Sequence, residues 1–101
     1  MNNTNACLLT IYTETILETR LVELIEEAGA TGYTITNARG KGSGGTRSAT
    51  WDADASIRVE IICSRNMANE LTQVLQDTYY DNFSMVTFIT DIEVIRQDKF
   101  E

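Results

Sequence analysis

Ala6-Cys7-Leu8-Leu9-Thr10-Ile11-Tyr12 is a short apolar run near the start of the chain, and its pattern predicts a β-strand. The apolar residues fall into two alternating sets: Cys7, Leu9 and Ile11 on one side, Ala6 and Leu8 on the other. Successive side chains of a strand point to opposite faces. A run that is apolar in both sets is therefore typical of a strand covered on two faces.

The segments that follow alternate between helical and extended patterns. Apolar residues recur at helical spacing from Leu17 onward, with Thr15-x-x-Glu18 as a capping box before them and Gly29 as the residue that ends the helix. Residues 32–37 alternate and are rich in β-formers, so we expect a second strand there.

The second half of the chain repeats this alternation. Apolar and polar residues alternate from Ala55 to Ile61, which predicts a third strand, and Ser64 then caps a second helix. The apolar stripe of that helix consists of Met67, Leu71, Val74 and Leu75. A fourth strand is expected from Met85 to Ile95. Its core face is expected to consist of Val86, Phe88, Ile92 and Val94, with Met85 and Ile89 opposite them.

The order β-α-β-β-α-β predicts a ferredoxin-like α+β fold, in which two helices cover one face of a four-stranded antiparallel sheet. The other face would then be open. Because the first strand is apolar on both sides, and because Met85 and Ile89 lie opposite the expected core set, that open face is apolar too. A sheet with a second apolar face usually buries it in an assembly, so we expect a homo-oligomer.

Composition limits the classes of function. The chain has 101 residues, which suits a single domain over residues 1–101, and its net charge of −7 argues against nonspecific binding to nucleic acid. It has no histidine, the usual base at neutral pH and the usual zinc ligand, so we expect neither catalysis nor a metal site. Cysteine usage favours a reducing, cytoplasmic setting, and no apolar run approaches the ~20 residues of a membrane span.

The segment between the second and third strands is rich in glycine, and residues 28–51 contain no acid. It carries Arg39, Lys41 and Arg47, and four of the six glycines of the chain fall within residues 40–45. Backbone N–H groups of such a loop can converge on phosphate or carboxylate oxygens, and an arginine can bind them in bidentate fashion. The spacing fits neither a Walker A loop nor a dinucleotide fingerprint. Two hypotheses remain, an anion-binding loop and a plain linker.

For the other candidate residues, the sequence favours a structural or solvent-exposed role over a chemical one. Cys7 and Cys63 lie in the expected core strands, with no polar partner nearby in sequence to lower the pKa of either thiol. Asp52 and Asp54 flank one residue near the loop, where two carboxylates are usually solvated rather than bound to a metal. Trp51 is a candidate for docking or base stacking, or else it folds back onto the sheet.

Several motifs resemble the P-II signal-transduction superfamily, whose members are β-α-β-β-α-β trimers. Gly32-Tyr33-Thr34-Ile35-Thr36-Asn37-Ala38-Arg39-Gly40-Lys41-Gly42 is similar to the G-M-T-V-x-x-x-R-G-F-G run that enters their T-loop, and Glu93-Val94-Ile95-Arg96 is similar to their closing E-V-I-R. The run Gly40-Lys41-Gly42-Ser43, followed by Arg47-Ser48, resembles the P-II-like proteins associated with carboxysomes and bicarbonate transporters more closely. The resemblance covers nearly the whole chain and implies a homotrimer with a flexible T-loop over about residues 40–54.

The resemblance implies a cytoplasmic sensor rather than an enzyme. Family members bind adenine nucleotides in clefts between subunits, which here implies Thr34 at the adenine, the turn residues Ser84 and Met85 in the cleft, and phosphate or ribose contacts from Gly40, Lys41, Gly42, Ser43, Arg47 and Arg96. Bicarbonate would bind at Lys41, Gly42 and Arg47. The order of the loop would then report inorganic-carbon and energy status to a partner such as a bicarbonate transporter or a carboxysome-related protein.

Departures from the family pattern refine this expectation. The turn Asn82-Phe83-Ser84-Met85 has no lysine, which weakens the grip on phosphate and favours ADP or AMP over ATP. The chain also lacks the C-terminal cysteine pair of the transporter-associated members, which favours the carboxysome-associated branch. Two alternatives remain, a small ferredoxin-like enzyme that uses its sheet face as a pocket, and a structural trimer in which the loop is a linker.

Overall fold

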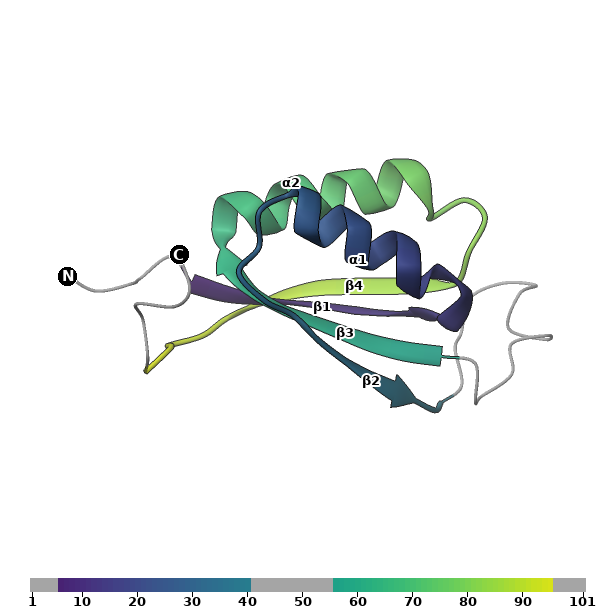
Figure 1. Ribbon diagram of the computed structural model, residues 1–101, viewed down its shortest axis with the longest axis horizontal. Coiled ribbons are helices and arrows are strands. Elements are labelled where there is room, and N and C mark those ends of the chain that lie inside the picture. Colours follow the sequence, from purple (N-terminus) through teal and green to yellow (C-terminus); the bar gives the residue numbers. More distant parts are fainter. Residues whose placement is uncertain (1–5, 41–55, 96–101) are drawn as a thin grey trace.

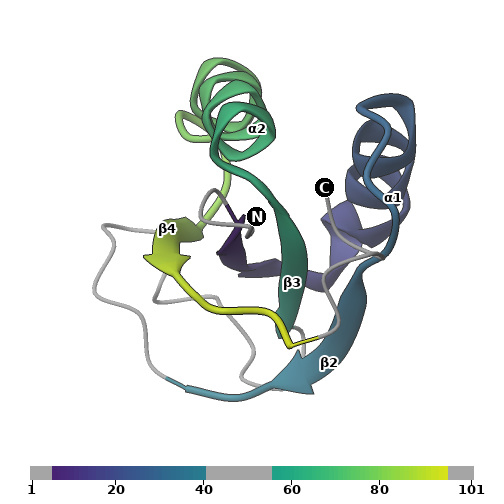
Figure 2. The same cartoon turned by 90° about the vertical axis from the view of Figure 1, so that its left-hand side faces the viewer.

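The computed structural model describes residues 6–40 and 56–95, which form one antiparallel sheet covered by two helices. The elements are β1 (Ala6–Glu14), the short 3₁₀ helix η1 (Thr15–Leu17), α1 (Glu18–Glu27), β2 (Thr34–Ala38), β3 (Ser56–Ser64), α2 (Arg65–Thr78) and β4 (Met85–Asp91). The strand order is β2-β3-β1-β4, and each neighbouring pair is antiparallel (Figure 1). Both helices lie on the same side of the sheet (Figure 2). The predicted ferredoxin-like α+β fold is confirmed.

The hydrophobic core lies between the sheet and the helices. The two central strands contribute Cys7, Leu9, Ile11, Ile57, Val59, Ile61 and Cys63, and the helical side contributes Leu17, Leu21, Ile25, Ala68, Leu71 and Leu75. The strand residues in this set occupy alternating positions because only every second side chain faces the helices. Full burial of a leucine or isoleucine contributes about 1.5–3 kcal/mol, so this layer is the main source of stability.

Local signals predicted the end of α1 and the start of α2, but not the start of α1. The Oγ of Ser64 accepts a hydrogen bond from the N–H of Met67 at 3.1 Å, which confirms the predicted cap. Gly29 has a positive φ of 89°, as a residue that ends a helix often does. The predicted Thr15 cap is wrong, because Thr15 lies inside η1 and no side chain caps either η1 or α1. The fully buried Leu17 holds this entry turn against the core instead.

The predicted faces of β4 are also wrong. Met85 and Ile89 pack against the core, whereas Val86 and Phe88 are 55% and 45% exposed on the open face. The register explains this, since Ile89 lies opposite the core residue Leu9 on β1. A shift of one residue moves every side chain of a strand to the other face. The strand ends at Asp91, before Ile92 and Val94. In α2, Val74 was expected in the apolar stripe but is exposed, and Ala68 is buried instead.

The open face of the sheet is nevertheless apolar, as expected. Tyr12 and Phe88 contact each other across β1 and β4, with ring centroids 6.3 Å apart. Val86 lies opposite Tyr12 in the same pair of strands, and Leu8 lies opposite Ile62 in β1 and β3. The second apolar face predicted for the sheet is therefore present, although β4 contributes different residues to it.

Candidate functional site

A pocket of about 380 Å³ lies where the start of β1, the start of β2 and the end of β3 meet. It is lined by residues of the segment before β2 and by open-face residues of three strands: Leu8, Thr31, Gly32, Tyr33, Thr34, Glu60 and Ile62. Leu8 lies opposite Ile62, and Thr34 lies opposite Glu60, so the register of the sheet places two cross-strand pairs side by side. Its volume falls in the range of ligand pockets, about 300–1,000 Å³.

The pocket combines an apolar wall with polar groups, among them those of Thr34 and Glu60. Leu8 and Ile62 are half-buried and supply the apolar surface, while Thr34 is exposed and can donate or accept a hydrogen bond. The carboxylate of Glu60 can only accept, and its Oε2 forms an ion pair with the Nε of Arg58 at 3.9 Å. Such a pocket suits a flat, largely apolar ring that presents an amino group to Glu60.

A second set of predicted site residues lies at the opposite end of the sheet. Glu14 of β1, Ser56 of β3 and Ala38 of β2 form one cross-strand row there, and Gly40 follows Ala38 by two residues. Ser84, just before β4, is bound to the end of β1 through both of its backbone groups. Its N–H donates to Oε2 of Glu14 at 2.7 Å, and its carbonyl accepts from Oγ1 of Thr13 at 2.7 Å.

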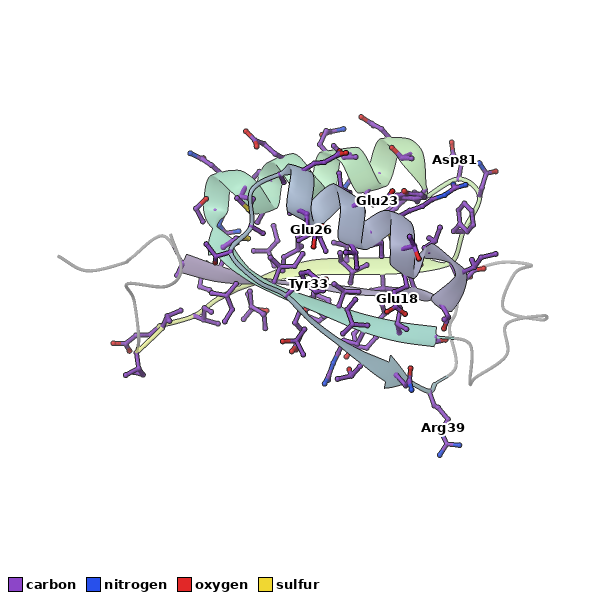
Figure 3. The ribbon with its side chains drawn as sticks, viewed as in Figure 1. Glu18, Glu23, Glu26, Tyr33, Arg39 and Asp81 are labelled. Carbon is purple, nitrogen blue, oxygen red and sulfur yellow. The ribbon has the colours of Figure 1, made fainter. Side chains whose placement is uncertain are left out.

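The two ends of the sheet are far apart within one copy of the chain. A strand rises about 3.3 Å per residue, so Thr34 and Gly40 lie on the order of 20 Å apart along β2. Figure 3 shows Tyr33 near the start of β2, and Arg39 beyond its end with its side chain directed away from the sheet. The structure therefore brings Gly40, Ser84 and Met85 to one end and leaves Thr34 at the other. The Met85 side chain packs against the core.

Many of the predicted site residues lie outside the described part of the chain. These are Lys41, Gly42, Ser43 and Arg47 of the expected T-loop, Arg96, and the candidates Trp51, Asp52 and Asp54. Their predicted contacts with phosphate and bicarbonate stay predictions.

The two cysteines belong to the core, as expected. Cys7 and Cys63 are paired in register across β1 and β3, and the Sγ of Cys7 donates to the carbonyl of Cys63 at 3.5 Å. Burial, with a smaller contribution from Cys7, raises the pKa of the Cys63 thiol to about 12. A thiol with so high a pKa is a poor nucleophile at neutral pH, because the thiolate is the reactive form.

Metal clusters and membrane-spanning helices are both absent from residues 6–40 and 56–95. Those residues contain no group of three or more cysteine, aspartate or glutamate side chains placed to hold a metal ion. Within the same ranges, no helix is long and apolar enough to cross a membrane.

Sequence reasoning identified Thr34 but missed the rest of the pocket. Leu8 and Glu60 come from strands far apart in the chain, and each looked like an ordinary member of an alternating pattern, whereas Ile62 directly follows the alternating run. The alternation shows which residues share a face within one strand. It does not show which residue of the neighbouring strand lies opposite, so the pocket could not be assembled from the pattern.

Comparisons with known proteins agree with the observed fold. The family model "Nitrogen regulatory protein P-II" matches residues 6–99. A PII-like signaling protein from Thermus thermophilus has 40% sequence identity and a TM-score of 0.81, with 100% of both chains covered.

The PII-like protein CPII from Thiomonas intermedia is similar in two ligand-bound structures. One, bound to ADP, AMP and acetate, has 30% identity and a TM-score of 0.79, with 94% of this chain and 93% of that chain covered. The other, bound to ADP and bicarbonate, has 29% identity and a TM-score of 0.81, with 95% and 94% covered.

Proposed function

This chain belongs to the nitrogen regulatory protein P-II family, and we propose that it is a homotrimeric sensor that binds ADP or AMP, together with bicarbonate, in clefts between subunits. Nucleotide binding would change the order of the segment over about residues 40–54 within the single domain of residues 1–101. A partner such as a bicarbonate transporter or a carboxysome-related protein would respond to that change. The protein would act by binding, without catalysis.

The observation that carries the proposal is the pocket around Thr34. Its apolar wall of Leu8 and Ile62 suits one face of an adenine ring. The exocyclic amine of adenine is a donor, whereas guanine carries a carbonyl acceptor at the corresponding position. Glu60 can accept a hydrogen bond from this amine, whereas opposite guanine two acceptors would face each other. The pocket should therefore prefer adenine. Thr34, predicted from the family motif to contact adenine, lies opposite Glu60 in the same pocket.

The distance between the Thr34 pocket and the sheet end that holds Gly40 and Ser84 supports a cleft between copies of the chain. In one copy, the adenine pocket and the end that holds Gly40 and Ser84 lie at opposite ends of the strands. Joining the pocket of one copy to the glycine-containing end of its neighbour would complete one nucleotide site per interface. A closed ring of three copies repeats this head-to-tail arrangement.

The open face of the sheet supports the same assembly. Val86 and Phe88 are exposed large apolar residues on that face, and such patches mark interaction surfaces. The Nε of Arg58, also on that face, is buried; Oε2 of Glu60 lies 3.9 Å away, beyond hydrogen-bond distance, and no described residue accepts a hydrogen bond from this Nε. Buried polar groups are normally paired, so an acceptor from a neighbouring copy would complete this site.

The bicarbonate part of the proposal is supported by the Thiomonas protein, which binds bicarbonate together with ADP. The residues proposed to hold bicarbonate here are Lys41, Gly42 and Arg47. They combine two cationic side chains with a glycine, which has no side chain to shield its backbone N–H, a composition suited to a small oxyanion.

Calorimetric titration of the purified protein tests the proposal. ADP or AMP should bind, bicarbonate should tighten that binding, and light scattering should give the mass of three chains. Glu60→Gln should weaken the preference for ADP over GDP, because glutamine can also donate to the guanine carbonyl. Glu26→Gln, on the exposed surface of α1, removes the same charge away from the pocket and should leave that preference unchanged. Absence of any adenine-nucleotide binding would leave the structural or enzymatic alternatives in its place.

A further inference from the structure

The peptide groups around Ser84 are held by two consecutive residues of β1. Thr13 is fully buried on the helix side of the sheet, and its Oγ1 donates to the Ser84 carbonyl at 2.7 Å. Glu14 belongs to the opposite face, and its Oε2 accepts from the Ser84 N–H at 2.7 Å. The alternation of β1 thus lets adjacent side chains approach one residue from two sides. The turn before β4 is anchored to the end of β1 by these two bonds.

The Glu14 carboxylate lies among the residues proposed to meet the phosphates. It shares a cross-strand row with Ser56 and Ala38, and the glycine-rich segment begins at Gly40, two residues after Ala38. Neighbouring strands lie about 4.8 Å apart, so Glu14 on β1 and Ala38 on β2 are separated by about 10 Å. Because the strand order is β2-β3-β1-β4, Glu14 lies between β2, which leads into that segment, and the turn that holds Ser84.

Glu14 already fills the position that a phosphate oxygen would take at Ser84. Backbone N–H groups in turns are common donors to bound phosphates. Here the N–H donates to a carboxylate at 2.7 Å, a short distance typical of a charge-assisted hydrogen bond. An incoming phosphate must displace this anion or lie close to it, and the turn offers no lysine to compensate for the repulsion.

We infer that Glu14 is a specificity-determining residue that selects against nucleotides with a longer phosphate chain. This inference rests on the proposed nucleotide site and adds to it a residue that the family motif did not indicate. Repulsion grows with the phosphate charge brought near the carboxylate, so it is greatest for ATP and least for AMP. The missing lysine and the built-in carboxylate act in the same direction.

The test is the ratio of ATP affinity to AMP affinity, measured by calorimetry on the full chain. In Glu14→Gln, the amide oxygen can still accept from Ser84 while the charge is lost. Two unit charges about 4 Å apart in a high-dielectric setting change an affinity about fivefold, so the ratio should rise about fivefold. Glu14→Ala removes both the charge and the acceptor and should raise the ratio at least as much. Glu70→Gln, on the exposed surface of α2, is the matched control and should leave it unchanged.

The outcomes separate this inference from the function on which it rests. Suppose that the wild type binds nucleotide, but that the ATP-to-AMP affinity ratio in both Glu14 variants falls or stays within twofold of the wild-type ratio. This result overturns the role of Glu14 and leaves the proposed sensor function intact. A rise of the same size in Glu70→Gln also overturns it, because net charge would then be the cause. Absence of binding in the wild type overturns both. Glu14→Asp, which keeps the charge, should retain the wild-type ratio, and an increase there would count against the charge argument.

Discussion

Ile61 and Ile62 are adjacent on β3 but face opposite sides of the sheet, which makes them a matched pair for testing the pocket. Ile61 is fully buried in the core, whereas Ile62 is half-buried and forms the apolar wall of the pocket. Ile62→Ala removes three carbon atoms, worth about 2.4 kcal/mol if all were covered. Because a flat ring covers one side of the chain, we expect about half of this, or roughly an eightfold weaker binding of ADP.

The control is Ile61→Val, which removes one buried methylene on the core side. We expect it to lower the free energy of unfolding by about 0.5–1.5 kcal/mol without weakening ADP binding. Calorimetric titration gives the affinities, and thermal unfolding without ligand gives the stabilities. An ADP affinity within twofold of wild type in Ile62→Ala would refute the placement of the base in this pocket. Equal weakening in both variants would show that binding follows overall stability rather than contact with Ile62.

Three further predictions concern the assembly and the core. Phe88→Asp puts a charge on the apolar open face, and light scattering should show a smaller assembly; an unchanged mass would contradict that interface. Thr13→Val removes the donor to Ser84, a bond worth about 1 kcal/mol, and should lower the melting temperature by about 4–8 °C in calorimetric unfolding. Because burial raises the pKa of Cys63 from 9.0 to about 12, the unfolded chain loses this proton first, and stability should fall as pH rises through that range. In Cys63→Ala, the free energy of unfolding should fall less steeply with pH. Denaturant titrations at several pH values measure this slope, and an equal slope in wild type and variant would show that the thiol is not responsible.

Local patterns were sufficient wherever a structural feature depends on neighbours in the chain. The Ser64 cap needs only a side chain and an N–H three residues later, and the Gly29 turn needs only a residue that tolerates positive φ. The helical spacing of Leu21 and Ile25 identified the buried face of α1, because helix geometry brings such residues to one side. The order of elements then restricted the fold to a split βαβ arrangement.

β4 shows where such patterns fail. Both of its alternating sets contain large apolar residues, so periodicity alone does not identify the face that meets the helices. The larger apolar set suggested Val86 and Phe88, but the strand ends before Ile92 and Val94 could add to it. Pairing with β1 set the true orientation, and that pairing is a contact between segments more than seventy residues apart.

The sequence by itself determined the fold class and the apolar character of both sheet faces, and its family motif singled out one pocket residue, Thr34, as a contact for adenine. The tertiary structure alone decided that Leu8, Glu60 and Ile62 join Thr34, and that Glu14 binds the N–H of Ser84. The physical reason is the range of the interactions. Helix spacing, caps and strand alternation act within a few residues. The pocket and the hydrogen bond between Glu14 and Ser84 depend on the register between strands, which only the packed sheet defines.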